Sequence, residues 1–308
     1  MMIRKKILYP IELCIYNFVV RFLLWKRPSY KKKYDISICA IFKNESSFLK
    51  EWIEYHCLVG IDHIYMYNNN SDDDYLAILE PYIKNGYVTL VHWDKDNAQM
   101  AAYKHFFETF KEETQWMVFL DLDEYIVPRK KNTIKEWIKG YEKFPVILVY
   151  WKMFGTSGMM KHDYSKLVIE QYVVSHEGFA THKGKCFVNT DYELSFYNEM
   201  THHSTCVNYP IGGIKIRMQP VNQFKRFVVG GYHLSFLGEK NPSIQINHYW
   251  SMAWDRFEAK RKMTDVFFKD NPKRNLDYFY GFEEQNICCD YSVFRFLMKL
   301  KHRMLGVS

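Results

Sequence analysis

The first part of the chain alternates between short apolar runs and longer amphipathic stretches. The runs are rich in Ile, Val, Phe and Tyr, whereas the stretches repeat apolar residues at helical spacing. This pattern predicts strands over 36–42, 63–67, 87–93 and 117–120, and helices over 48–58, up to about 83, and over about 98–111. Strands and helices that alternate in this way are typical of a mostly parallel sheet with helices on both faces. The pattern therefore predicts an α/β fold.

Polar residues gather where the predicted strands end. Lys43, Asn44 and Glu45 follow the first strand, and an Asn- and Asp-rich stretch at 68–74 follows the second. Open α/β sheets bind their ligands at the carboxyl ends of the strands, so we expect a binding site at this edge. No GxGxxG motif follows the first strand, which disfavours a dinucleotide-dependent oxidoreductase.

Both ends of the chain are basic and amphipathic. Apolar residues recur at helical spacing among Lys and Arg, both before residue 33 and near the C-terminus. Such helices lie in the headgroup region of an anionic membrane, although they can equally pack on the domain. Glu12 and Arg21 interrupt the N-terminal run, and no small-residue cleavage site follows it, so neither a spanning helix nor a cleaved signal peptide is expected. We therefore divide the chain into a basic segment at 1–33, a domain at 34–290 and a basic helix at 291–308.

The charge balance differs between the ends and the body. The total is +7, but residues 1–33 contribute +8 and residues 294–308 contribute +4, which leaves −5 for the region between them. A nucleic-acid-binding domain usually carries a basic stripe across its body, so no nucleic-acid partner is expected. Seven cysteines without a CxxC pair fit a reducing compartment. These features favour a cytoplasmic enzyme, attached peripherally to the inner leaflet by its ends.

The most informative segment is 116–126, an apolar strand that ends in Asp121 and Asp123. Two aspartates two residues apart on an extended backbone point to the same side. Carboxylates that close repel each other unless a divalent cation lies between them, and Mg²⁺ or Mn²⁺ bound in this way also takes oxygens from substrate phosphates. A phosphatase of the Asp-x-Asp-x-Thr type would need Thr at position 125, which is Tyr125.

Four segments together resemble the family-92 glycosyltransferases and their bacterial relatives. They lie at 38–65, 119–126, 151–158 and 246–261, and their order and spacing are similar to the family pattern. The resemblance implies a GT-A fold and an inverting, metal-dependent transfer of a sugar. The donor would be a nucleotide diphosphate sugar, a UDP-sugar by this resemblance, and the acceptor a hydroxyl of a glycan or a lipid-linked glycan.

The resemblance also implies positions that contact the donor. Residues 43–45 would lie near the base and residues 68–72 near the uridine ribose, although the family more often has Asp in place of Asn68. Residues 151–158 would shape the acceptor side, where Gly155 and Gly158 suit a backbone that approaches a sugar closely. The implied donor-binding residues are Lys43, Asn44, Glu45, Asn68, Asn69, Asp72, Gln99, Tyr103, Asp121, Lys185 and His248.

The metal ligands and the catalytic base follow from the same resemblance. Asp123 would bind the metal directly, and Asp121 would contact the metal or the ribose. His203 or His202 is the preferred further ligand, while His248 is expected in the donor or acceptor region.

An inverting reaction also needs a carboxylate that removes the acceptor proton. Asp163, Glu170 and Glu177 are the candidates, and Glu170 is favoured because it ends a strand-like run.

Two other functions remain open at this point. A metal-dependent phosphate hydrolase would cleave phosphoesters without a sugar acceptor. A noncatalytic membrane-associated protein would bind sugar nucleotides without releasing the nucleotide. The presence of both Asp121 and Asp123 argues against the noncatalytic alternative.

Overall fold

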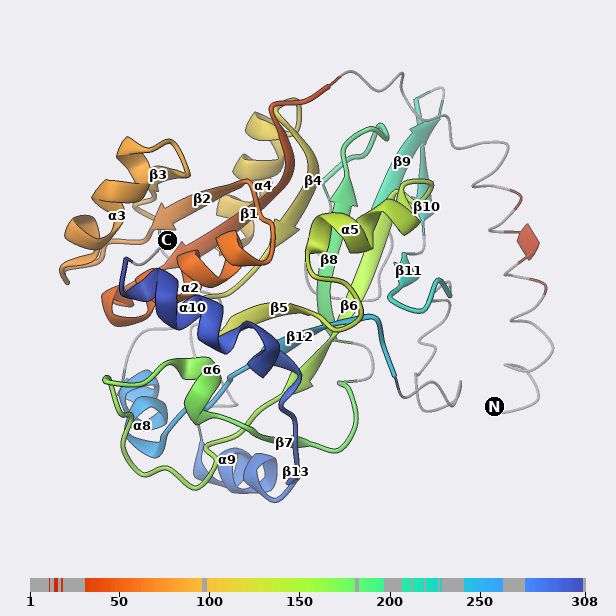
Figure 1. Ribbon diagram of the computed structural model, residues 1–308. Coiled ribbons are helices and arrows are strands. Elements are labelled where there is room, and N and C mark those ends of the chain that lie inside the picture. The colour runs from red at the N-terminus through yellow and green to blue at the C-terminus, as the bar shows by residue number, and fades with distance from the viewer. Residues whose placement is uncertain are drawn as a thin grey trace.

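The computed structural model describes residues 31–95, 99–180, 183–196, 207–211, 213–218, 220–226, 228, 241–262 and 275–306, together with Ile11, Cys14, Ile15 and Phe18. Its centre is a nine-stranded sheet in the order β3–β2–β1–β4–β8–β6–β12–β5, with β11 beside β6 (Figure 1). The strands are β1 (Tyr34–Phe42), β2 (His63–Asn68), β3 (Val88–His92), β4 (Thr114–Phe119), β5 (Glu124–Pro128), β6 (Val146–Met153), β8 (Gly184–Asn189), β11 (Val221–Asn222) and β12 (Ile244–His248).

Helices and two small strand pairs surround this sheet. One pair joins β7 (Val174–His176) to β13 (Asn286–Cys289), and the other joins β9 (Val207–Ile211) to β10 (Ile214–Met218). The helices are α2 (Ser46–Leu58), α3 (Tyr75–Lys84), α4 (Gln99–Phe110), α5 (Ile134–Ile138), α6 (Val168–Gln171), α8 (Trp254–Lys262), α9 (Leu276–Glu283) and α10 (Leu297–Met304), with single 3₁₀ turns η1 (Lys139–Tyr141) and η4 (Ser292–Phe296).

The predicted α/β fold is confirmed. Strands β3, β2, β1 and β4 run parallel, and β6 runs parallel to β12 and β11, whereas β8 and β5 enter antiparallel. The elements expected in the first part of the chain are present with small shifts at their ends, from β1 through β4.

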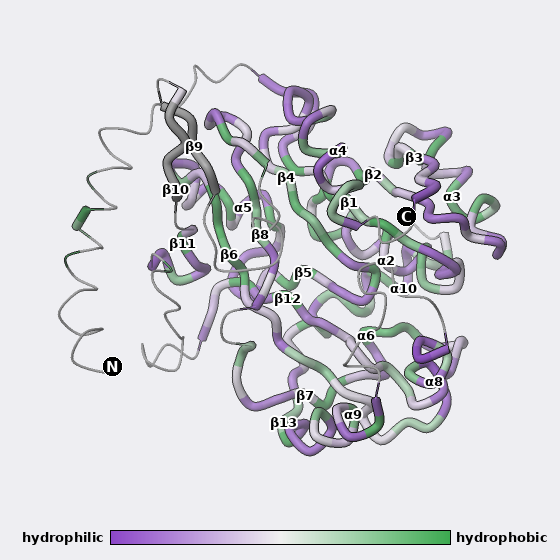
Figure 2. The backbone as a smooth tube through the Cα atoms, turned by 180° about the vertical axis from the view of Figure 1, so that it is seen from behind, coloured by the Kyte–Doolittle hydropathy of each residue, from purple (hydrophilic) through white to green (hydrophobic). Residues whose placement is uncertain are grey.

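Two hydrophobic cores cover the two faces of the sheet. Successive side chains of β1 alternate, so Ile38 joins the core that contains Trp52 of α2, whereas Cys39 joins the core that contains Phe106 of α4. Figure 2 shows the hydrophobic colouring that runs along β1, β4 and β6 between these layers. A sheet buried on both faces explains why its strands read as continuous apolar runs.

The basic C-terminal helix α10 packs against α2 (Figure 1). Leu300 is fully buried, Lys301 Nζ lies 2.6 Å from Glu170 Oε1, and Arg303 Nη2 lies 2.8 Å from Glu54 Oε2. Part of its apolar face is therefore covered by the domain itself.

The N-terminal segment is described at only a few positions. Ile11, Ile15 and Phe18 are helical and more than half exposed, and the rest of 1–30 lies outside the described residues. Within the described residues, every helix is too short or too polar to cross a lipid bilayer. Attachment to an anionic membrane surface stays a prediction.

Glu170 lies in the short helix α6, so the expectation that it ends a strand-like run is wrong. The buried carboxylate of Glu51 on α2 accepts hydrogen bonds from Val168 N (2.8 Å) and Ile169 N (3.2 Å), the first backbone groups of α6. These groups have no partner within a helix, so an external carboxylate stabilises the turn. The apolar run at 167–169 therefore packs as a capped helix.

Replacing Glu51 should change how stability depends on pH. Burial raises the pKa of Glu51 to about 7, against 4.5 ordinarily, although the bonds from Val168 and Ile169 oppose the shift. The folded protein then holds a proton that the unfolded chain has lost, so the free energy of unfolding falls as pH rises from about 4.5 through about 7. Between pH 5 and pH 8, we expect this fall to be about 2 kcal/mol smaller in Glu51→Gln. Urea unfolding of both proteins at pH 5 and pH 8 measures this free energy of unfolding.

Glu80→Gln is the matched control, because Glu80 is exposed on α3. An equal pH dependence in wild type and Glu51→Gln would show that Glu51 does not hold a proton near neutral pH.

Candidate functional site

The loops that follow β1 and β2 meet at one edge of the sheet. The two strands are parallel neighbours, so both loops leave from their carboxyl ends. Asn44 Oδ1 accepts a hydrogen bond from Asp72 N (2.9 Å), and Asn44 N donates to Ser71 Oγ (3.0 Å). Asn44 has a left-handed backbone with φ of 55°, which Asn tolerates better than most residues. The predicted donor-binding residues 43–45 and 68–72 therefore lie side by side.

Asn68 and Asn69 hold the second loop in shape. Asn68 Oδ1 accepts from Ser71 N (3.0 Å), and Asn69 Nδ2 donates to the carbonyls of Trp93 (2.8 Å) and Lys95 (2.9 Å). Both side chains are buried, whereas Asp72 is exposed and Lys43 is half-buried. The two asparagines thus fix the backbone of the loop through these bonds.

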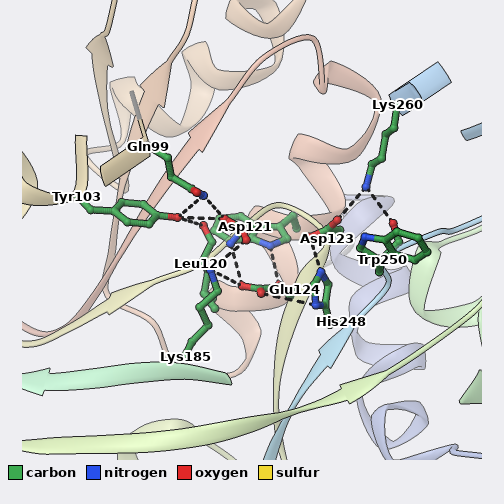
Figure 3. Close-up of polar contacts among 11 residues, drawn as sticks. Gln99, Tyr103, Leu120, Asp121, Asp123, Glu124, Lys185, His248, Trp250 and Lys260 are labelled. Atoms are coloured by element: carbon green, nitrogen blue, oxygen red, sulfur yellow. Dashed lines mark hydrogen bonds and ion pairs between the residues drawn. The ribbon is translucent and has the colours of Figure 1, made fainter. Parts of the chain in front are cut away.

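Asp121 is held from both sides of the sheet edge (Figure 3). Gln99 Nε2 (2.7 Å) and Tyr103 OH (3.0 Å), one turn apart on α4, donate to its Oδ1. Lys185 Nζ, on the adjacent strand β8, donates to its Oδ2 at 3.0 Å. Three predicted donor-site residues therefore converge on Asp121 and fix its orientation.

Lys185 is a fully buried cation between two carboxylates. Its ammonium lies 3.3 Å from Glu124 Oε2, and that oxygen also accepts a hydrogen bond from Asp121 N at 2.9 Å. Burial opposes the charge, but Asp121 and Glu124 outweigh it and raise the pKa of Lys185. Removing one member of such a buried pair leaves an uncompensated charge, so each depends on the other.

Asp123 lies next to a second pair of basic groups. Lys260 Nζ on α8 donates to its Oδ2 at 2.8 Å, and His248 Nε2 on β12 lies 3.5 Å from its Oδ1. Burial works against ionisation, but Lys260 and His248 outweigh it and hold the pKa of Asp123 well below its ordinary value. Asp123 is therefore a stable anion, and its Oδ1 is buried with no hydrogen-bond partner among the described residues.

The residues around Asp123 fit a divalent cation that the ligand completes. No group of three or more His, Cys, Asp and Glu side chains in the described part of the chain forms a metal cage. Asp123 Oδ1 and His248 Nε2 lie 3.5 Å apart, close to the roughly 3 Å that separates adjacent ligands of an octahedral Mg²⁺ or Mn²⁺. Mg²⁺ and Mn²⁺ sites in phosphate chemistry commonly use one or two protein ligands plus substrate oxygens. His202 and His203, the preferred further ligands, lie outside the described residues.

The three candidate bases have different surroundings. Glu170 pairs with Lys301, and Asp163 Oδ1 accepts hydrogen bonds from Ser165 N (3.0 Å) and Oγ (2.6 Å). Glu177 is exposed, and its backbone carbonyl accepts from Lys152 Nζ (2.9 Å). Among the contacts of the described residues, none of the three carboxylates touches Asp123.

The sequence interpretation missed two residues of the site. Glu124 and Lys260 belong to the Asp123 cluster, and their only sequence signal was their place in the segments 119–126 and 246–261. Gly155 was expected to let the backbone approach a sugar. A Cβ at that position would overlap the side chains of Asn286 and Glu283, so internal packing by itself requires a glycine there.

Comparisons with known proteins identify a family that this chain resembles over most of its length. The profile of Glycosyltransferase family 92 matches residues 32–279. A glycosyltransferase family 92 protein of Ricinus communis is 30% identical over 239 residues, covering 75% of this chain and 38% of the relative. A galactan beta-1,4-galactosyltransferase, GALS3 of Arabidopsis thaliana, is 27% identical over 139 residues, 41% of this chain and 27% of the relative.

A solved structure, S. aureus TarS 1–349, is 14% identical with a TM-score of 0.35. The match covers 51% of this chain and 47% of the TarS chain. The present chain spans about two fifths of the length of the Ricinus relative.

Proposed function

The chain belongs to glycosyltransferase family 92, and on that basis we propose that it transfers a sugar from a UDP-sugar donor to a hydroxyl of a glycan or a lipid-linked glycan. The observation that carries the proposal is the anionic Asp123 at the carboxyl edge of the sheet, with one buried oxygen that has no hydrogen-bond partner among the residues described. Sheets of this kind bind phosphate-containing ligands at that edge. The relative named as a galactosyltransferase makes a galactose donor the first to test.

We propose that Asp123, with His248 beside it, holds Mn²⁺ or Mg²⁺ together with the donor diphosphate. Such a cation offsets the negative charge that grows on the leaving nucleotide, without a proton transfer. Lys185 holds one oxygen of Asp121 in place, and Gln99 and Tyr103 fix its second oxygen. Asp121 is thereby oriented to accept a hydrogen bond from the ribose or to contact the cation.

Removing the Asp123 charge should abolish metal-dependent turnover of the donor. In Asp123→Asn, we expect Mn²⁺-dependent release of UDP from UDP-galactose to fall about 100-fold or more, because the neutral amide binds a divalent cation poorly. Coupled detection of UDP, with Mn²⁺ and with chelator, measures it across a panel of UDP-sugars.

Glu108→Gln is the control, because Glu108 is exposed on α4. Wild-type release that is unaffected by chelator would contradict the metal dependence. Cleavage of phosphoesters in place of UDP-sugars would favour the hydrolase.

We propose an inverting reaction in which Glu177 removes the acceptor proton. Asp163 and Glu170 are engaged by Ser165 and Lys301, whereas the Glu177 side chain is exposed in the strand-to-strand loop that Lys152 anchors through backbone carbonyls. Lys152 belongs to the segment 151–158 expected on the acceptor side, and it pairs in register with Asn247, the residue before His248.

Three matched variants test this choice. Glu177→Gln should slow transfer to a galacto-oligosaccharide about 100-fold or more and leave UDP affinity unchanged, since general-base loss affects the chemical step. Glu170→Gln and Asp163→Asn should transfer at near wild-type rates. Full transfer by Glu177→Gln, with loss in either other variant, would assign the base elsewhere. Transfer rate and UDP affinity are measured in parallel.

A further inference from the structure

Helix α8 presents two cations, one helical turn apart, to two acids at the carboxyl edge of the sheet. Lys260 Nζ lies 2.8 Å from Asp123 Oδ2, and Arg256 Nη2 lies 3.4 Å from Glu45 Oε2. Residues four apart on a helix lie on the same face, so one face of α8 carries both contacts. The acids come from the loop after β1 and the loop after β4, which are neighbouring parallel strands.

Lys260 already forms an ion pair with Asp123, the carboxylate that the proposed metal would bind. Its ammonium is fixed at a second point by the carbonyl of Trp250 at 3.3 Å (Figure 3). The side chains of Lys260 and Asp123 are only 25% and 16% exposed, so solvent screens this ion pair less than a surface pair. The other Asp123 oxygen, Oδ1, has no hydrogen-bond partner in the described part of the chain and lies 3.5 Å from His248 Nε2.

We propose that Lys260 is an internal cation that competes with the divalent metal for Asp123 and is displaced when metal and donor bind together. The inference rests on the proposed function, because that function makes Asp123 a metal ligand. A divalent cation at Oδ1 and an ammonium at Oδ2 would repel each other across one carboxylate. Lys260 therefore weakens binding of the metal alone.

A displaced Lys260 can contact the donor diphosphate next to Asp123. Its four-carbon stem is flexible, and its strongly hydrated point charge pairs well with phosphate oxygens. A donor diphosphate supplies such oxygens, so Lys260 can pair with the nucleotide when the metal binds Asp123. Metal and nucleotide then favour each other's binding, and by linkage this coupling is reciprocal.

The rest of α8 has contacts that do not involve Lys260. Arg256 pairs with Glu45, and its guanidinium lies 4.6 Å from the ring centroid of Phe48. Phe257 is buried and stacks on Phe279 of α9 with centroids 4.3 Å apart. We therefore expect the helix to stay in place when Lys260 is replaced.

Mn²⁺ affinity without nucleotide tests the inference. Free Mn²⁺ is titrated by electron paramagnetic resonance against wild type, Lys260→Gln and Lys262→Gln. Lys262 is exposed on the same helix, so its variant loses the same charge without touching Asp123. We expect Lys260→Gln to bind Mn²⁺ about fivefold more tightly than wild type, and Lys262→Gln to stay within about twofold. With UDP present, the difference in Mn²⁺ affinity between Lys260→Gln and wild type should shrink or reverse.

Equal Mn²⁺ affinities in Lys260→Gln and Lys262→Gln, or weaker binding in Lys260→Gln, would overturn the inference. UDP release by the wild type, measured separately, distinguishes this failure from a failure of the proposed function. Asp123→Asn supplies the last check, because Mn²⁺ binding that survives in it would place the metal elsewhere and overturn the competition as well.

Discussion

The site depends on neutralising three carboxylates that the chain places within four residues. Asp121, Asp123 and Glu124 are largely withdrawn from water, and carboxylates so close together repel each other. Lys185 compensates Asp121 from within the sheet and pairs with Glu124, whose pKa burial raises well above its usual range, and Lys260 compensates Asp123 from α8. Without these two lysines, the loop between β4 and β5 would hold uncompensated buried charge, which is strongly destabilising.

The topology of the sheet explains how these charges meet. Strand β8 enters antiparallel beside β4, which brings Lys185 under the loop that follows β4. Strand β12 pairs with β5 in a register that sets His248 opposite Glu124. Elements far apart in sequence are thus required to build one polar cluster, and the two hydrophobic cores hold them in register.

The parts of the fold predictable from sequence are those with local signals. Strand β1 and helix α2 can be recognised from the spacing of their apolar residues and from the length of each run. Their prediction therefore needs no information on distant residues. The acids at the end of β4 were identifiable for the same reason, since a buried strand followed by an Asp-x-Asp pattern is visible within ten residues. The chemical roles of the residues around them came from the family resemblance and remain proposals.

Long-range contacts account for what the sequence could not show. Lys260 acts 137 residues from its partner Asp123, and no local pattern distinguishes it from the exposed Lys262. The run at 167–169 has strand-like composition, but Glu51 from a distant helix caps it as α6. Gly155 was assigned to the ligand because the packing of Asn286 and Glu283 against it is not visible in sequence.

The central claim is that Asp123 and its neighbours bind the diphosphate of a nucleotide through a divalent cation. Isothermal titration of UDP into the wild-type protein, with Mn²⁺ and again with chelator, tests it most directly. The account predicts saturable binding of one UDP with Mn²⁺ and a loss of affinity of at least about 1.4 kcal/mol, or tenfold, with chelator. Equal affinity under both conditions, or no binding of UDP in either, would contradict it.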